Sequence, residues 1–425
     1  MQTELRAIKK ETLPNGLTIV TEEMPVVRSV AVGIWVKSGS RVEPAPLNGI
    51  SHFIEHMVFK GTERRSVEQI ARESDALGGH LDAFTTKELV CFNAKVLDEH
   101  LPRGLDILAD LVLAPLFQED DIRRERNVIL EEIKMDEDNP DYLVHEMFAQ
   151  TMWRGHAMGR PVLGTQETLA GFRQPVVKDF FRTWYVPNQM LITAAGHLDH
   201  ARFVEQVAGY FHQIPARGNG YRDVTPTSVA DIAMRNKREL KQVHLCVGAP
   251  CYPLAHEQRY TVALLNTILG GGMSSRLFQN IREREGLAYA IFSDVQAYRD
   301  TGCLVVYAGT ATETAQRTLR LVLEEFRRLK QEPVAAEELR RAQDNLKASL
   351  VFSLETTTAR MSNLARQEIY FGRFFTFDEV LAEIDAVTPE QIQAVARDCL
   401  QPERLGVSAV GQLNDFHLSR DELDC

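Results

Sequence analysis

The chain has 425 residues, which is more than one ordinary hydrophobic core holds, so at least two domains are expected. Hydrophobic residues make up 44% of it and charged residues 25%, which is typical of a globular protein. Its 48 basic and 59 acidic side chains give a formal net charge of −11. This excess of acid argues against nucleic acid as the main partner, because phosphate binding requires a basic face.

The sequence shows no sign of export or membrane insertion. The N-terminal stretch is charged and has no apolar run of signal-peptide length, and no run of roughly 18 or more apolar residues could span a bilayer. The six cysteines are scattered, and no pair has the C-x-x-C spacing of a metal site. We therefore expect free thiols in a reducing compartment, and a cytoplasmic protein without a membrane partner.

The predicted elements alternate between strands and helices along the chain. After a Leu-Pro-Asn-Gly turn at 13–16, the patterns predict strands at 17–20 and 29–36, helices at 49–59 and 66–77, strands within 81–96, helices from 101 to 185 and a buried strand at 191–196. The glycine- and proline-containing segment that follows has the composition of a linker. After it, the same order of strands and helices begins again.

An internal repeat accounts for this recurrence. Pro187 and Gly196 enclose a polar turn and an apolar strand, and Pro402 and Gly411 enclose a similar segment with the same spacing. At this period a repeat indicates duplicated domains rather than a solenoid. The sequence thus predicts an α+β fold of two homologous halves, each an antiparallel-rich β-sheet packed against α-helices. The expected divisions are a metal-binding half at 1–215, a linker at 216–234 and a second half at 235–425.

The segment His52-Phe53-Ile54-Glu55-His56 has the inverted order H-x-x-E-H within a helical pattern. Residues four apart lie one turn apart, so His52 and His56 project from one face and can chelate a single ion. Glu55 lies on the same side, where a carboxylate can take a proton from a zinc-bound water. By itself, such a string is also compatible with a pair of ordinary core or surface histidines.

A catalytic zinc site usually has a third protein ligand, which a second helix can supply. Glu125 and Glu132 are seven residues apart and share a helix face, whereas Glu131 points about 100° away from Glu132. A solvated face with ion pairs is the structural alternative. At the corresponding positions, however, the second half has Ala342 and Ser349, and it has no paired histidines near 260–269. The second half is expected to share the fold without the paired histidines and the two glutamates. The fold therefore does not require them, which favours a chemical role for these residues in the first half.

On these residues the chain resembles the pitrilysin/insulinase family, in its branch of bacterial peptidases similar to the β-subunit of the mitochondrial processing peptidase. The resemblance runs nearly end to end, and Glu132 follows His56 by 76 residues, as a ligand glutamate does in that family. It implies a zinc endopeptidase with one Zn²⁺ per chain, bound by His52, His56 and Glu132. Glu55 would be the general base, and Glu125 would orient a ligand.

The resemblance also implies residues that handle the substrate. The segment Gly79-His80-Leu81-Asp82-Ala83-Phe84-Thr85 is similar to the glycine-led edge strand that binds the substrate backbone by strand addition. Arg282 and Tyr289 are similar to a pair that stabilises the developing oxyanion. An ordinary turn and strand, a solvated arginine and a strand tyrosine are the alternatives. Gly270-Gly271-Gly272 lacks the G-K-[ST] ending of a P-loop, and we interpret it as a flexible turn between helices.

The predicted activity is hydrolysis of short or unfolded polypeptides. Relatives of this length pair two chains into an enclosure, so a homodimer is expected in which Arg282 and Tyr289 complete the zinc site of the other chain. Two alternatives remain at this point: a non-catalytic assembly subunit, and a subunit that acts only with a different partner chain.

Overall fold

The computed structural model describes residues 8–218, 220–413 and 416–425. Residues 1–7, part of the stretch in which no signal-peptide pattern was found, lie outside the described residues, as does position 219 of the expected linker. The chain divides into two compact units, which are described separately below. The first comprises Met1–Ile133, Arg160–Asp223 and Phe352–Thr376, and the second comprises Lys134–Gly159, Val224–Val351 and Phe377–Cys425.

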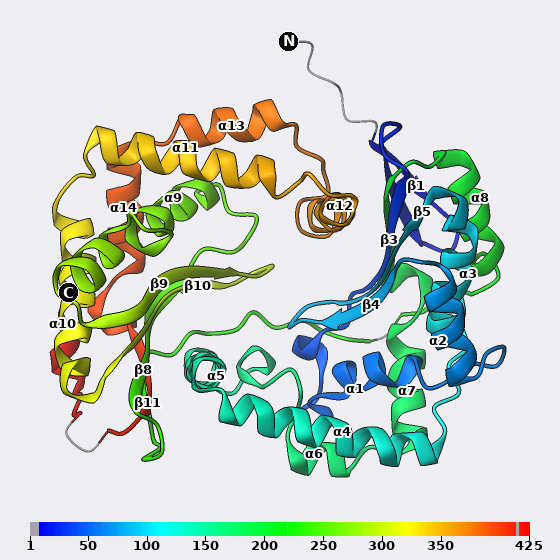
Figure 1. Cartoon of the computed structure of the whole chain (residues 1–425), viewed down its shortest axis with the longest axis horizontal. Coiled ribbons are helices and arrows are strands. Elements are labelled where there is room, and N and C mark those ends of the chain that lie inside the picture. Colours follow the sequence, from blue (N-terminus) through cyan, green and yellow to red (C-terminus); the bar gives the residue numbers. More distant parts are fainter. Residues whose placement is uncertain (1–7, 219, 414–415) are drawn as a thin grey trace. The chain divides into compact units, whose positions relative to one another are not determined.

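The first unit is built on a six-stranded sheet of order β1-β2-β6-β3-β5-β4 (Figure 1). Its strands are β1 (Ile8–Thr12), β2 (Thr18–Glu23), β3 (Ser29–Val36), β4 (His80–Thr85), β5 (Val90–Leu97) and β6 (Met190–Gly196). Only the β2–β6 pair is parallel among the described strands of this sheet. Strand β4 has β5 as its one neighbour in the sheet, so it forms an edge.

The second unit contains a five-stranded sheet of order β7-β11-β8-β10-β9. Its strands are β7 (Ile232–Asn236), β8 (Gln242–Cys251), β9 (Ala288–Ala297), β10 (Gly302–Ala311) and β11 (Gly406–Gly411). The β7–β11 pair is parallel and the other pairs described here are antiparallel. Apart from β1, the two sheets therefore share their strand order and the place of their parallel pair, which confirms the predicted fold of two homologous α+β halves.

The repeated Pro–Gly segments adopt the same local structure in both units. Pro187 and Pro402 each begin a short 3₁₀ turn that leads into an interior strand of the sheet, β6 or β11. Gly196 and Gly411 end these strands with φ values of 140° and 147°. A Cβ atom would lie 2.2 Å from the Ser29 carbonyl oxygen at the first position and 2.5 Å from that of Gln242 at the second. Only glycine tolerates both the positive φ and the close approach of a carbonyl oxygen. This requirement explains why a glycine occupies the corresponding position in both halves of the sequence.

Helices cover both faces of each sheet. In the first unit they are α1 (Ile50–Val58), α2 (Val67–Ala76), α3 (Leu101–Leu113), most of α4 (Glu119–Asp138), α6 (Gln166–Ala170), α7 (Gln174–Trp184), α8 (His200–Phe211) and α12 (Thr357–Phe371). In the second they are α5 (Pro140–Met152), α9 (Arg259–Gly270), α10 (Ala315–Gln331), α11 (Ala336–Phe352), α13 (Phe377–Asp385) and α14 (Pro389–Cys399). None of the helices in the described part of the chain has the length and apolar character that crossing a membrane requires.

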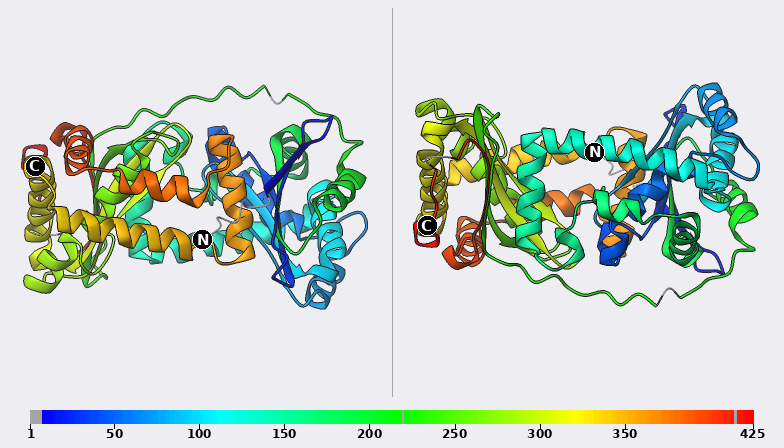
Figure 2. Two further views of the ribbon diagram at one scale, coloured as in Figure 1. Left: turned by 90° about the horizontal axis from the view of Figure 1, so that it is seen from above. Right: turned by 90° about the horizontal axis from the view of Figure 1, so that it is seen from below.

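Each sequence half contributes one helix to the sheet of the other half. Helix α12 packs on β2, β3 and β6 of the first unit, where it is visible as the orange helix beside the blue strands (Figures 1 and 2). Helix α5 packs on β8 and β11 of the second unit. Strands such as β3 are buried on both faces, so the second face of each sheet needs a cover. The compact units consequently differ from the divisions 1–215, 216–234 and 235–425, which follow the repeat in the sequence.

Candidate metal centre

Helix α1 carries the inverted motif, and a distant carboxylate caps its N-terminus. Gly49 is the N-cap residue and has no side chain to offer. Instead Glu43, 2% exposed, accepts hydrogen bonds from the backbone N–H groups of Gly49 at 2.7 Å and Ser51 at 2.8 Å. These are donors that the first turn of a helix leaves without partners. Burial raises the pKa of Glu43 to about 7, although the hydrogen bonds from Ser51, Gly49 and Asn48 oppose this shift.

The start of α1 is also held against the segment 160–164. The Asn48 side-chain amide donates to the Pro161 carbonyl at 2.9 Å, and Arg160 donates to the Glu43 carbonyl at 2.8 Å. Gly49 has φ 92°, and a Cβ atom there would lie 2.6 Å from the Leu163 carbonyl oxygen. A glycine is therefore required at the point where the chain turns into the metal-binding helix.

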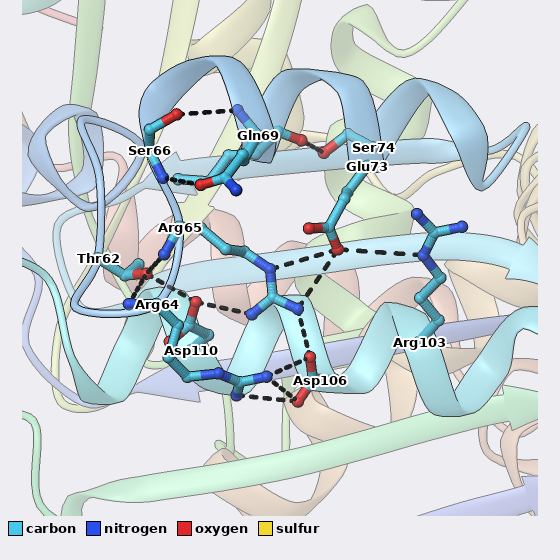
Figure 3. A network of polar contacts seen from close by, with 11 residues as sticks. Thr62, Arg64, Arg65, Ser66, Gln69, Glu73, Ser74, Arg103, Asp106 and Asp110 are labelled. Carbon is cyan, nitrogen blue, oxygen red and sulfur yellow. Dashed lines mark hydrogen bonds and ion pairs between the residues drawn. The ribbon is translucent and has the colours of Figure 1, made fainter.

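The segment after α1 is anchored to α3 by a buried charge network (Figure 3). Asp110 of α3, 4% exposed, accepts from Thr62 Oγ1 and Arg65 Nη1, both at 2.7 Å. Asp106, one turn earlier, forms ion pairs with Arg65 and with Arg64, the latter at 2.8 Å. Polar contacts thus hold both ends of α1, which limits the movement of the side chains between them.

His52 and His56 project from one face of α1, with ring centroids 4.6 Å apart. Their Nε2 atoms lie 3.7 Å and 3.8 Å from Oε2 of Glu132 on α4. One ligand atom from each of the three residues can be chosen so that all lie within 4.8 Å of one another. The structure therefore brings together the three residues that the sequence predicted as ligands, from two helices separated by 60 residues of chain, 59–118.

This donor set fits a tetrahedral zinc ion. Zinc–ligand bonds of about 2.0–2.2 Å place two tetrahedral ligand atoms about 3.3–3.6 Å apart, only slightly less than the Nε2–Oε2 separations found here. Metal binding also requires unprotonated imidazoles. Burial, followed by the charge of His56, lowers the pKa of His52 to about 3, so this ring is neutral near pH 7. Burial also lowers the pKa of His56, but its hydrogen bond to Glu125 and the neighbouring carboxylates outweigh this effect and raise it, so metal binding there competes with a proton.

Glu125 fixes the orientation of His56. Its Oε1 lies 2.8 Å from His56 Nδ1, and its Oε2 forms an ion pair with Lys60 Nζ at 2.6 Å. Burial raises the pKa of Glu125, but the hydrogen bonds from His56 and Lys60 outweigh it and keep the pKa below its usual value. With Nδ1 engaged, His56 directs Nε2 toward Glu132, which is the arrangement of a ligand held by an outer carboxylate.

Glu131 and Glu132 differ in surroundings as the helical register predicts. Glu131 is exposed on α4, whereas Glu132 is half-buried and faces the two histidines. Glu125, two turns earlier, is buried on the same face. At the matching position on α11, Ala342 is buried in the apolar core of the second unit. The position of Glu125 is thus a core position in the other unit, whereas Ser349, which matches Glu132, is exposed there.

Glu55 lies between the histidines and the edge strand β4. Thr85, the last residue of β4, donates a hydrogen bond from Oγ1 to Glu55 Oε2 at 2.6 Å. Burial raises the pKa of Glu55, and the Thr85 hydrogen bond opposes this effect. Glu55 lies outside the His52–His56–Glu132 donor group. It is thus a part-buried carboxylate next to that group and attached to the edge of the sheet.

The predicted substrate segment coincides with the edge strand. Gly79 directly precedes β4, and His80 to Thr85 form it with alternating exposure. The Asp82 carbonyl accepts a hydrogen bond from Asn93 at 3.3 Å, and the Phe84 ring packs edge-on against Trp35 with centroids 5.8 Å apart. Leu81 and Ala83 point inward and pack on the main core. The strand is therefore anchored by Leu81 and Ala83 on one face, by Phe84 on the other and by β5 along one edge.

Arg282 and Tyr289 adjoin each other within the second unit. Arg282 belongs to a short π-helix, Phe278–Arg284, and Tyr289 to β9. The guanidinium carbon of Arg282 lies 5.4 Å from the Tyr289 ring centroid and 4.7 Å from that of Phe278. Tyr289 is 79% exposed. Of the predicted turn Gly270–Gly272, Gly270 is the last residue of helix α9 and Gly271 its C-cap, and the chain then leads into this helical segment.

Two residues of the site were not found from the sequence. Glu43 caps α1 from six residues before Gly49, across one 3₁₀ turn, and Lys60 pairs with Glu125 from just beyond the helix. Lys60 follows His56 by four residues and so lies near it, a spacing that could have indicated a partner for Glu125. No sequence rule indicates a cap from as far away as Glu43.

The comparisons with known proteins agree with this architecture. Residues 18–166 match the family described as Insulinase (Peptidase family M16), and residues 172–346 match its Peptidase M16 inactive domain. A Bacillus subtilis protein named uncharacterized zinc protease YmxG is 40% identical over 390 residues, covering 92% of this chain and 95% of its own. A Streptomyces coelicolor protein named uncharacterized zinc protease SCO5738 is 39% identical, covering 97% and 91%. The chain belongs to the insulinase family of peptidases, family M16.

A solved structure shares the fold at low sequence identity. The crystal structure of a protease from Helicobacter pylori superposes with a TM-score of 0.88 at 20% identity, covering 96% of this chain and 100% of that one. The fold predicted from the internal repeat is therefore that of an M16 peptidase.

Proposed function

We propose that the chain is a zinc-dependent endopeptidase that hydrolyses peptide bonds in short or unfolded polypeptides. The observation that carries this proposal is the convergence of His52, His56 and Glu132 next to a part-buried Glu55. Names of relatives as zinc proteases support the same choice of metal. We propose one zinc ion per chain, held by these three ligands.

When bound, zinc supplies Lewis-acid chemistry: it polarises the scissile carbonyl and lowers the pKa of a water molecule. Glu55 takes the proton of the attacking water and later passes it to the leaving amine. A raised pKa suits a group that must both accept and return this proton. Thr85 orients Glu55 through its hydrogen bond, and Glu125 orients His56.

The substrate would be held extended along β4. An edge strand offers unpaired backbone groups, so a peptide can add to it as a further strand. Because Thr85 of β4 bonds Glu55, a peptide on this edge would approach the base at the end of the strand. Such binding uses main-chain atoms and so accepts many sequences, but only in segments without their own fold.

A non-catalytic or heteromeric subunit is the competing proposal. The match to the inactive domain, residues 172–346, begins late in the first half and covers much of the second half, whose positions matching Glu125 and Glu132 are Ala342 and Ser349. The first half retains three possible ligands and the adjacent glutamate, which favours catalysis by this chain. We further propose a cytoplasmic homodimer in which Arg282 and Tyr289 stabilise the developing oxyanion at the partner chain's site.

Replacement of Glu55 by glutamine tests the proposed function. The amide keeps the size of the side chain but cannot accept the proton, so hydrolysis of an unfolded casein peptide should fall at least about a hundredfold. Zinc content, measured by atomic emission on the same preparation, should stay near that of the unmodified chain. Activity that survives in zinc-loaded Glu55→Gln protein would exclude Glu55 as the base, and an inactive, zinc-loaded native chain would favour the non-catalytic alternative.

A further inference from the structure

Two of the six cysteines meet in the second unit although they are 148 positions apart. Cys251 is the last residue of β8 and Cys399 is the last residue of α14. The Cys399 thiol points at Cys251 with 3.7 Å between the sulfur atoms. We propose that Cys251 and Cys399 form a peroxide-sensitive thiol pair, which oxidises to a disulfide between β8 and α14.

The backbone segments that carry the two sulfurs are already fastened together. Tyr252, next to Cys251, donates a hydrogen bond to Oδ2 of Asp398, next to Cys399, at 2.6 Å. Strand β8 and helix α14 also pack directly on each other. A disulfide forms when side-chain rotation alone can bring the sulfurs into bonding distance. The hydrogen bond between Tyr252 and Asp398 holds the backbone at both cysteines in place, so that only the side chains need to rotate.

The two thiols differ in exposure and in pKa, as one attacking and one resolving thiol should. Cys251 is half-buried, whereas Cys399 is 1% exposed. The hydrogen bond from Cys399 lowers the pKa of Cys251, with further contributions from the Tyr252 backbone and the charge of Arg404. The same contact and burial raise the pKa of Cys399. Cys251 is therefore the accessible thiolate and attacking group, and Cys399 the protonated thiol that follows.

The oxidation is balanced with hydrogen peroxide as the co-reactant. The Cys251 thiol first loses its proton to solvent, and the thiolate attacks one peroxide oxygen. The O–O bond breaks to give a sulfenic acid and hydroxide, and the hydroxide takes up the released proton to become the first water. The Cys399 sulfur then attacks the Cys251 sulfur, the S–O bond breaks, and hydroxide leaves with the thiol proton as the second water. Two thiols are oxidised by two electrons in total, and one peroxide is reduced to two waters.

The product would stabilise the second unit. A cross-link between positions far apart in the sequence restricts the unfolded chain strongly, so the melting temperature should rise on oxidation and return on reduction. The metal ligands belong to the first unit, so this response does not depend on the proposed peptidase activity.

Mass spectrometry on the full chain tests the proposal. After treatment with dilute hydrogen peroxide and blocking of free thiols, trypsin should release peptides 242–259 and 398–404 joined, with a mass lower by two hydrogens than their sum. Cys246 shares the first peptide, so fragment ions must assign the bond to Cys251. Dithiothreitol should separate the peptides and return the melting temperature to its initial value.

Substitutions supply the controls. Cys251→Ser and Cys399→Ser should each abolish the joined peptide and the shift in melting temperature, whereas Cys91→Ser, in the first unit, should leave both intact. In Cys399→Ser protein, dimedone should label Cys251, because its sulfenic acid has lost the second thiol. If a variant fails to fold, the peptide map of the unmodified chain decides. Thiols that stay reduced, a bond to Cys303 or Cys246 instead, or a persistent sulfenic acid in the unmodified chain would overturn the proposal.

Discussion

The ligand set rests on individual carboxylates whose roles differ by position on one helix. Glu132 faces both imidazoles, Glu125 contacts Nδ1 of His56 and Nζ of Lys60, and Glu131 is exposed. A direct ligand contributes a bond to the metal, whereas an outer carboxylate only orients and polarises a ligand. Chemically similar residues should therefore respond differently to the same substitution.

We expect Glu132→Gln to remove most of the zinc, because a neutral amide oxygen replaces an anionic ligand. Glu125→Gln should weaken zinc binding by about 10- to 100-fold through the orientation of His56. Glu131→Gln is the matched control and should leave zinc binding unchanged. Zinc content after dialysis against a graded chelator measures all three. Loss of metal in the Glu131 variant alone would place the ligand one residue away from our assignment.

Glu43 should make the stability of the chain depend on pH. Its folded-state pKa of about 7 lies above the ordinary value of 4.5, so its contribution is full below pH 4.5 and is lost as pH rises through about 7. The loss should total roughly 3 kcal/mol at about 1.4 kcal/mol per pKa unit. Because Glu43→Gln does not titrate, the difference in unfolding free energy between it and the zinc-free native chain should change in this window.

Urea denaturation at intervals between pH 4.5 and 8 measures this difference. The native chain should lose stability relative to Glu43→Gln as pH rises, and the difference should level off above about pH 7. A constant difference over the whole range would show that Glu43 has the same pKa in the folded and unfolded chains. In that event the hydrogen bonds from Gly49, Ser51 and Asn48 offset the effect of burial on the pKa of Glu43.

At the scale of elements, β4 and α1 work as a pair. The strand is fixed by β5 along one edge and by the Thr85–Glu55 hydrogen bond at its end, while its other edge has no strand neighbour in the described sheet. In an antiparallel or parallel addition, successive residues of the added peptide alternate between bonding the edge and pointing away from it. Binding along β4 should therefore have a period of two residues.

A series of substrate peptides, each with one N-methylated amide, tests this pattern. Methylation of amides that face β4 should raise KM by roughly tenfold per lost hydrogen bond, at about 1–1.5 kcal/mol each. Methylation of the amides between them, the matched controls, should have little effect away from the scissile bond. An effect that is uniform along the peptide, or absent, would argue that side-chain pockets rather than the strand edge hold the substrate.

At the scale of the whole molecule, the metal ligands are confined to one unit and the Arg282–Tyr289 pair to the other. A chain with one metal-binding half and one half without ligands has two unlike surfaces to offer to a second copy. In a two-fold dimer each surface occurs twice, so two equivalent mixed sites result. The proposal that the pair acts in trans follows from this symmetry.

Complementation between inactive chains tests the trans arrangement. Glu55→Gln protein and Arg282→Ala, Tyr289→Phe protein should each have little activity alone. After subunit exchange, heterodimers contain one intact site and should regain up to about half of the native activity per dimer. Exchange is verified by native mass spectrometry with chains of different tags. Verified heterodimers without recovered activity would show that the pair acts within its own chain or has no catalytic role.

Local patterns in the sequence determined much of this protein. The H-x-x-E-H spacing placed His52 and His56 on one face of α1, the seven-residue spacing aligned Glu125 with Glu132, and the two Pro–Gly segments revealed the repeat. These features are readable because helical and strand periodicity depend on neighbouring residues. The ends of β6 and β11 leave an equally local mark, since only glycine tolerates the backbone conformation of Gly196 and Gly411.

Only the tertiary structure decided which distant residues meet. Glu43 caps the first turn of α1, and Cys251 contacts Cys399. Helices α5 and α12 each pack on the sheet formed by the other half of the sequence. None of these pairings has a fixed spacing or periodicity, because each depends on how whole elements pack. Both faces of each sheet are apolar and must be covered by helices. The sequence of a strand does not indicate whether the covering helix, α5 or α12 here, comes from its own half of the chain or from the other.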